Sequence, residues 1–245
     1  MLTLRRLAAL AVLVLFAAGP VLAQDADADE EGTTGTLSQT PKNLSNAAFN
    51  EGNKALRAGN YADALNNFNE GINILDDNAR NHLGRALALA KLDREDDAEA
   101  AYERAIQLAE AANERKVLSL AKKNLSVLYL RTAAEGVKAD PPTSSGARSA
   151  IAALDKAKEA GIDDPNTHYY YARAYNALGQ HERAVAAGEA GAEAQRGGPA
   201  DKAKYYYEIG LAQKALGNDA AARAAFENAT YGSFRQAAEY EIDLL

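Results

Sequence analysis

The first residues to examine for chemistry are the three histidines, His82, His168 and His181, because imidazole can act as a general base or as a metal ligand near neutral pH. They lie far apart in the sequence and share no metal-ligand spacing. The chain has no cysteine, which excludes disulfides, thiolate metal sites, cysteine nucleophiles and the anchor of a bacterial lipoprotein. The sequence therefore predicts neither a metal site nor a histidine-based catalytic centre.

Other patterns that carry catalysis are equally weak. Gly197-Gly198-Pro199 lacks the Lys-Ser pair and the strand that accompany a phosphate-binding loop. Carboxylates are plentiful, but they stand at helix-surface spacing beside basic residues, as in Glu103-Arg104 and Glu182-Arg183. We predict that the chain is not an enzyme and that it uses no cofactor.

The composition of the chain indicates that its functional side chains are carried by helices. Hydrophobic residues make up 47% of the chain but aromatic residues only 7%, and Ala is abundant, which suits closely packed helices. Only six prolines and no run of alternating Val, Ile and Thr leave almost no signal for strands. The predicted fold class is all-α.

The clearest helix covers residues 61–75, where apolar side chains recur with the spacing of one helix face. The preceding segment also has a helical pattern and ends in Gly59-Asn60, which is typical of a C-terminal cap and turn. Two helices with so short a connection must lie antiparallel, as a hairpin. The apolar positions are Tyr61, Ala64, Leu65, Phe68, Ile72 and Leu75.

This hairpin recurs along the chain. The pattern Ala-x3-Phe-x2-Gly at residues 64–71 is matched by Ala-x3-Tyr-x2-Ala at residues 98–105, 34 residues later. Residues 171–184 and 209–222 form a second matching pair, 38 residues apart. Such a helix–turn–helix period resembles the tetratricopeptide repeat. The resemblance implies a right-handed superhelical solenoid of about five helical hairpins with a C-terminal capping helix.

The repeat register sets the expected borders of the hairpins. The resemblance covers about residues 45–232, and the third unit has an enlarged turn at residues 140–146. The expected units are 45–78, 79–112, 115–164, 165–198 and 203–232, followed by the capping helix at 234–245.

Residues 1–23 have the parts of a secretory signal peptide. Arg5 and Arg6 precede an apolar stretch, and Val21-Leu22-Ala23 offers small residues for cleavage before Gln24. An uncleaved anchor is the alternative, although the apolar run is shorter than the roughly 20 residues that span a bilayer. We expect cleavage near Ala23-Gln24, a periplasmic or secreted protein, and no stable membrane insertion after cleavage.

The next segment, residues 24–44, is acidic and poor in apolar side chains, and we expect it to form a disordered tether. The whole chain has a formal net charge of −7. Because binding to a phosphate backbone needs clustered Lys and Arg, this charge argues against a nucleic-acid partner.

In the family that this sequence resembles, the first helix of each hairpin lines a concave groove that holds a peptide. The resemblance implies a groove of aromatic, amide and basic side chains, the types that dominate protein-binding hot spots. The tyrosines at 169–171, and those at 205–207, cannot all face this groove, because consecutive helical residues point about 100° apart. The candidate groove residues are Phe49, Asn53, Arg57, Lys123, Arg131, Tyr169, Arg173, Asn176, Tyr207 and Lys214.

The sequence thus predicts an exported scaffold of the bacterial cell envelope that grips a protein or peptide partner of unknown identity in its groove. The alternative is a structural, self-associating envelope protein, since Ala-rich helices could stack between copies as a homo-oligomer. Glu239, Glu241 and Asp243 place charge on the expected capping helix and argue against open end-to-end stacking.

Overall fold

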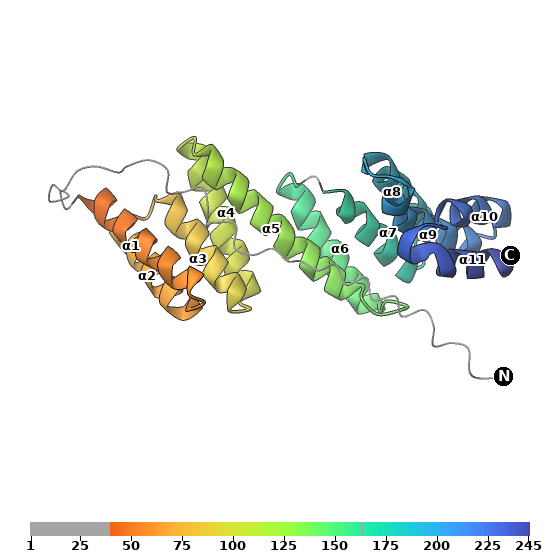
Figure 1. The fold of residues 1–245 in the computed structure, drawn as a ribbon, viewed down its shortest axis with the longest axis horizontal. Helices are drawn as coiled ribbons and strands as arrows, with labels where there is room; N and C mark the ends of the chain where they lie inside the picture. The colour runs from red at the N-terminus through yellow and green to blue at the C-terminus, as the bar shows by residue number, and fades with distance from the viewer. Residues whose placement is uncertain (1–39, 163) are drawn as a thin grey trace. The chain divides into compact units, whose positions relative to one another are not determined.

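The computed structural model describes residues 40–162 and 164–245. All regular structure in these residues is helical (Figure 1), which confirms the predicted all-α class. No helix in this part of the chain is long and apolar enough to cross a membrane. The predicted signal peptide, residues 1–23, and the predicted tether as far as residue 39 lie outside the described residues.

The described residues fall into two compact units, with the boundary between Leu128 and Tyr129. Both are built from helical hairpins, in which we call the first helix A and the second helix B. Each of the five expected repeat units contains most of one such pair of helices, although the first pair begins at Pro41, before residue 45, and the fifth at Pro199, before residue 203. A further helix follows the last pair. The helices of the first unit are α1 (Pro41–Arg57), α2 (Tyr61–Ile74), α3 (Ala79–Lys91), α4 (Glu95–Ala111) and α5 (Arg115–Gly136), which continues across the boundary. Those of the second unit are α6 (Ser144–Glu159), α7 (Pro165–Ala177), α8 (His181–Ala194), α9 (Pro199–Ala215), α10 (Asp219–Asn228), the 3-10 helix η2 (Gly232–Phe234) and α11 (Arg235–Asp243).

Helix α1 begins earlier than the composition of the chain indicates. The predicted tether extends to residue 44, but residues 41–44 are helical, so this border is wrong. The hydroxyl of Thr40 accepts a hydrogen bond from the backbone N–H of Asn43 at 3.3 Å, and Pro41 occupies the first turn. A capping threonine followed by proline starts a helix even where the side chains are polar.

Glycine in the left-handed region forms the turn of several hairpins. Gly59 has a φ of +78° and donates to the carbonyl of Leu56 at 3.1 Å, while Asn60 donates to that of Ala55 at 2.9 Å. These are the hydrogen bonds that close a helix end in which one residue turns left-handed, a conformation that costs glycine little. Gly179 and Gly217 repeat this arrangement with φ of +70° and +76°.

The aromatic residue of helix B fills the space between successive A helices. In the first unit the ring of Phe68 is fully buried. A Cβ atom on Gly52 of α1 or on Gly84 of α3 would lie 2.6 Å or 2.3 Å from this ring, far inside van der Waals contact. In the second unit, a Cβ atom on Gly210 would lie 2.5 Å from the ring of Phe226. The small residues of the repeat therefore allow the helices to pack closely around an aromatic ring.

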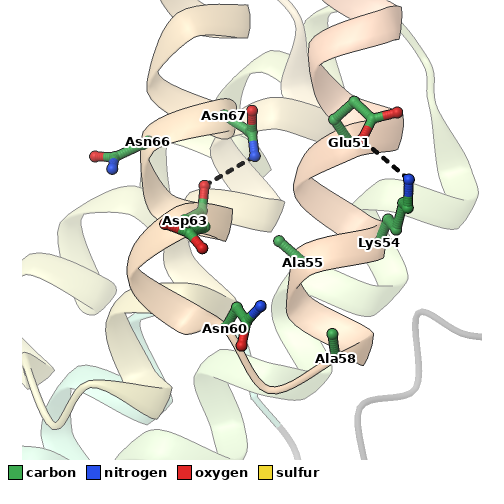
Figure 2. A pocket seen from close by; sticks show the side chains of 8 residues that line it. All are labelled: Glu51, Lys54, Ala55, Ala58, Asn60, Asp63, Asn66 and Asn67. Atoms are coloured by element: carbon green, nitrogen blue, oxygen red, sulfur yellow. Dashed lines mark hydrogen bonds and ion pairs between the residues drawn. The ribbon is translucent and has the colours of Figure 1, made fainter.

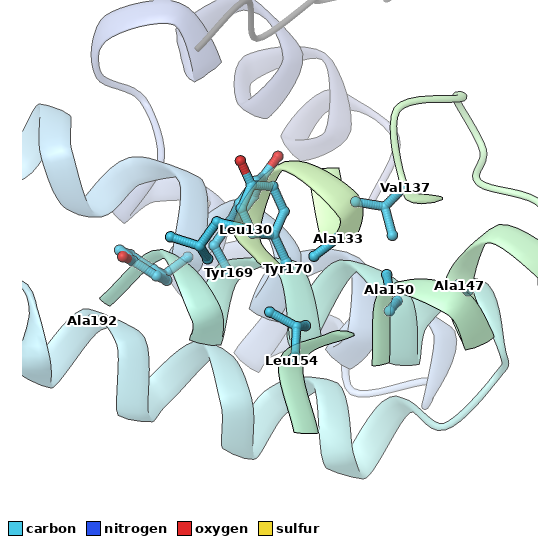
Figure 3. Close-up of a cluster of buried hydrophobic side chains, with 11 residues drawn as sticks. Leu130, Ala133, Val137, Ala147, Ala150, Leu154, Tyr169, Tyr170 and Ala192 are labelled. Carbon is cyan, nitrogen blue, oxygen red and sulfur yellow. The ribbon is translucent and has the colours of Figure 1, made fainter. Parts of the chain in front are cut away.

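The core of the second unit, shown in Figure 3, combines small and aromatic side chains from several helices. Tyr169 and Tyr170 are buried, whereas Tyr171 is half-buried. In the triplet at 205–207, the first tyrosine is buried and the other two are half-buried. The three tyrosines of each triplet therefore point in different directions, as the helical period requires. The buried members of this cluster are Leu130, Ala133, Val137, Ala147, Ala150, Leu154, Tyr169, Tyr170, Ala174, Ala192 and Tyr205.

Helix α11 covers the apolar end of the last hairpin. Its residue Ala238 is buried in a cluster with Phe226 of α10. Lys214 of α9 forms an ion pair with Glu241 of α11, with Nζ 2.8 Å from Oε2. The C-terminal helix therefore caps this unit through both apolar and ionic contacts.

Candidate functional site

A first hollow, of about 460 Å³, lies between α1 and α2 (Figure 2). Its lining is polar and mostly exposed. Lys54 and Glu51 form an ion pair at 3.6 Å, with side-chain exposures of 79% and 64%. Because water screens such an exposed pair, its charges add little to the binding of a ligand. Its lining residues are Glu51, Lys54, Ala55, Ala58, Asn60, Asp63, Asn66 and Asn67.

A smaller hollow, of about 190 Å³, lies in the second unit. Its walls come from the loop after α5, from α7, from the start of α8 and from α9. Unlike the first hollow, it is lined by an ion pair between a half-buried arginine and a buried glutamate, and we call it the Arg173–Glu208 pocket. Its lining residues are Asp140, Pro141, Pro142, Arg173, Asn176, Ala177, His181, Glu208 and Leu211.

The carboxylate of Glu208 is the most deeply buried charge of this pocket, because only 1% of the residue is exposed. Its Oε1 accepts a hydrogen bond from Nη1 of Arg173 at 3.2 Å. Nδ2 of Asn176, on the same helix as Arg173, donates to Oε2 of Glu208 at 3.0 Å and to its backbone carbonyl at 2.9 Å. Two residues of α7 thus supply the donors that a buried carboxylate of α9 needs.

Arg173 also fastens the loop that follows α5. Its Nε donates to the carbonyl of Val137 at 2.9 Å, and its Nη2 donates to that of Ala139 at 3.2 Å. The same Nη2 lies 3.5 Å from a carboxylate oxygen of Asp140. One guanidinium therefore joins α7, α9 and the enlarged turn, which suits its fixed fork of donors.

Burial and mutual attraction shift the pKa values of both charged groups. Burial raises the pKa of Glu208 above its ordinary value of 4.5, and neither the charge of Arg173 nor the hydrogen bond from Asn176 cancels this effect. Burial by itself would lower the pKa of Arg173, but the charge of Glu208 reverses this, so the pKa of the guanidinium is raised. The pocket thus combines a permanent cation with a carboxyl group that takes up a proton more readily than an ordinary one.

The raised pKa of Glu208 makes the stability of the second unit depend on pH. Since Glu208 binds a proton more readily in the folded than in the unfolded chain, its contribution to the free energy of unfolding increases as the pH falls through the raised pKa toward 4.5. We expect Glu208→Gln to remove this contribution, so that acidification over that window stabilises the wild type relative to the variant. Urea unfolding of both proteins at several pH values measures the difference. A difference that stays constant, or that moves the other way, would contradict the raised pKa.

A further basic side chain, Lys204 of α9, lies close to two aromatic rings. Its Nζ is 5.5 Å from the ring centroid of Tyr169 and 5.0 Å from that of Tyr205. It also donates a hydrogen bond to Oδ1 of Asn166. Burial lowers the pKa of Lys204, although nearby aspartates oppose this shift. The sequence analysis did not select this residue.

Two of the predicted groove residues meet at the Arg173–Glu208 pocket, namely Arg173 and Asn176. Tyr169, one turn before Arg173 on α7, is buried, with its ring centroid 6.4 Å from that of Tyr205. Arg131 of α5 is half-buried.

The other two predicted residues of the second unit lie against its C-terminal segment. The ring of Tyr207 packs near that of Phe234, with centroids 5.5 Å apart. Lys214 is engaged by Glu241, as described above. Both side chains therefore contact the cap, and any role in binding a partner stays a prediction.

In the first unit, the predicted groove residues separate into buried and exposed ones. Phe49 is buried with its ring centroid 6.0 Å from that of Phe68, and Asn53 is only 5% exposed. Arg57 and Lys123 are exposed. None of the four lines the hollow between α1 and α2, and their role in binding also stays a prediction.

Glu208 is the functional candidate that the sequence analysis missed, and a signal for it exists. It follows Tyr205 by one helical turn and precedes Ala212 by another, and both of those residues are fully buried. A carboxylate on the buried face of a helix needs a partner. The period therefore indicates a buried acid here, but it does not indicate which helix supplies the cation.

The histidines do not form a metal site in the structure. His82 is buried, and its Nε2 lies 2.8 Å from the backbone carbonyl of Asp76. Nδ1 of His181 lies 3.3 Å from Oδ1 of Asn176, so its imidazole donates to the amide at the Arg173–Glu208 pocket. Within residues 40–162 and 164–245, no group of three His, Asp or Glu side chains is placed to hold a metal ion.

Comparison with known proteins shows likeness only among solved structures. No protein-family model and no curated protein matches the chain. A crystal structure of MamA is 18% identical and covers 76% of this chain and 90% of its own, with a TM-score of 0.48. MamA 41-end from Desulfovibrio magneticus RS-1 is 16% identical, with coverages of 76% and 93% and a TM-score of 0.48. YrrB, described as a TPR protein with an unusual peptide-binding site, is 15% identical, with coverages of 81% and 91% and a TM-score of 0.49. At these scores the likeness carries no argument about what this chain binds.

Proposed function

We propose that the chain is an exported protein-binding scaffold of the bacterial cell envelope, which holds a partner protein or peptide on the surface formed by α7 and α9. The observation that carries this proposal is the Arg173–Glu208 pocket, where three elements meet around a fixed ionic network. Side chains already held by internal hydrogen bonds lose little freedom when a partner binds, so such a surface is preorganised.

The export part of the proposal rests on the signal-peptide pattern of residues 1–23. Fractionation of cells that produce the chain with and without these residues tests this part. If the chain is exported, a shortened form is found outside the cytoplasm only when residues 1–23 are present. Retention of both forms in the cytoplasm would contradict it and leave the binding proposal untouched.

Photo-crosslinking tests the binding part and keeps Arg173 and Glu208 in place, although it removes the hydrogen bond from His181 to Asn176. A photoreactive amino acid in place of His181, at the pocket, is expected to link the chain to a partner in irradiated cells. The matched control carries the same amino acid in place of Glu189, an exposed residue further along the same helix. Identical products from both positions, or no product from position 181, would contradict binding at this surface.

Self-association is the second candidate function, and one observation favours it. Tyr240 of α11 and Leu244, the residue that follows this helix, are 58% and 55% exposed. Large apolar side chains paired in this way are typical of contact surfaces. The same photoreactive amino acid in place of Tyr240 distinguishes the two functions. A crosslinked product of twice the chain mass supports self-association, and absence of this product argues against it.

A further inference from the structure

The Arg173–Glu208 pocket has more spare hydrogen-bond acceptors than spare donors. Each guanidinium nitrogen of Arg173 already donates one hydrogen bond to Glu208 or to a carbonyl of the loop, which uses three of its five N–H groups. Both hydrogens of the Asn176 amide have partners on Glu208. Pro141 and Pro142 have no backbone N–H at all.

Most of the groups that remain are acceptors. Each carboxylate oxygen offers more than one lone pair, so Glu208 can accept further hydrogen bonds beside those from Arg173 and Asn176. The Asp140 side chain is 52% exposed and has only a distant contact of 3.5 Å with Arg173. When Nδ1 of His181 donates to Asn176, Nε2 of the neutral ring is an acceptor as well.

The charges of the pocket point the same way. When both carboxyl groups are ionised, those of Asp140 and Glu208 face one guanidinium, so the two carboxylates and the guanidinium together carry one excess negative charge. The remaining wall is apolar and consists of Ala177, Leu211 and the two prolines. A volume of about 190 Å³ admits a single long side chain and not a folded element.

We propose that this pocket receives the side chain of a lysine or arginine from the bound partner, so that the scaffold selects basic segments. The aliphatic stem lies along Ala177, Leu211 and the prolines, while the cationic head donates to Asp140 and Glu208. The proposal deepens the proposed function and rests on it. An acidic side chain fits less well, because it meets excess negative charge, and an amide side chain lacks the positive charge that the two carboxylates attract.

The pocket can be probed directly with single amino-acid derivatives. The protein is the chain from Gln24 onward, which keeps every described residue, with 13C-labelled Ala and Leu methyl groups. The probes are the Nα-acetyl N-methylamides of lysine, arginine, norleucine, glutamine and glutamate. We expect only the lysine and arginine derivatives to shift the methyl signals of Ala177 and Leu211 in a saturable manner. Added salt is expected to weaken the binding of both derivatives.

Two variants of Asp140 connect the signal to the proposed contact. We expect Asp140→Asn to lower the affinity for the lysine derivative roughly tenfold, because a charge-assisted hydrogen bond is lost. Asp140→Lys places an amine beside Glu208 and is expected to abolish the shifts. Asp243→Asn, a change of the same kind at an exposed residue of α11, is expected to leave them unchanged. Far-UV circular dichroism melts of all three variants confirm that they fold.

The possible outcomes separate this inference from the scaffold proposal. Equal shifts from norleucine and lysine would overturn the inference in favour of an apolar pocket, and stronger binding of glutamate would overturn it as well. Absence of shifts from every derivative also overturns it. In each of these cases a crosslinked partner at position 181 would still support the scaffold proposal. If no crosslinked product forms at position 181, the scaffold proposal itself is overturned.

Discussion

Replacing Arg173 by methionine is expected to lower the free energy of unfolding of the second unit by about 3–5 kcal/mol, because it leaves the carboxylate of Glu208 buried and without its cation. The variant also loses the donors that hold the carbonyls of Val137 and Ala139. The loss is measured by urea unfolding and by hydrogen exchange of the amides of α7 and α9.

Two companion variants give this prediction its control. Arg148→Met removes an exposed arginine of α6 and is expected to change the stability by less than about 0.5 kcal/mol. The double variant Arg173→Met with Glu208→Leu removes both charges and is expected to recover most of the loss, since an apolar pair of similar volume often replaces a buried ion pair without cost. If the double variant is as unstable as Arg173→Met alone, the lost loop contacts and not the orphaned carboxylate explain the effect.

Replacing Phe68 by alanine is expected to destabilise the first unit by about 3–5 kcal/mol, because a fully buried ring is removed. The ring lies against Gly52 of α1 and Gly84 of α3, so the cavity opens between two A helices. Hydrogen exchange of the amides of α1, α2 and α3 reports the loss directly, and urea unfolding gives its size.

Leu92→Ala is the control variant for this prediction. Leu92 is 36% exposed in the turn between α3 and α4, and its truncation is expected to cost less than about 1 kcal/mol. Gly84→Ala tests the same contact from the other side and is expected to cost about 1–3 kcal/mol, since its Cβ would overlap the ring. Similar small losses for Phe68→Ala and Leu92→Ala would show that the ring does not hold these helices together.

Several parts of the fold were predictable because they depend on contacts close in sequence. The apolar period of residues 61–75 predicts α2, and Gly59-Asn60 predicts the turn before it, since both signals act within a few residues. The border at residue 41 differs from the prediction because polar composition favours a tether, whereas Thr40 and Pro41 cap and start a helix. A capping signal of this kind is present in the sequence itself.

The candidate site was predictable only in part. Repeat position selected Arg173 and Asn176, which do line one pocket. The same reasoning selected Phe49, which is buried against Phe68, and Tyr207, which packs against Phe234. A repeat position specifies which helix face a residue occupies, but the neighbouring element decides whether that face stays open.

The helical hairpins of this chain can be predicted from its sequence, because helical period, turn glycines and small packing residues all act locally or between adjacent hairpins. Where the charges meet depends instead on the tertiary packing. Glu208 reaches Arg173 across 35 residues of sequence, and the carbonyl of Val137 reaches it across 36. Such a pair depends on how two helices and a loop pack together, and no periodicity within a single helix records that.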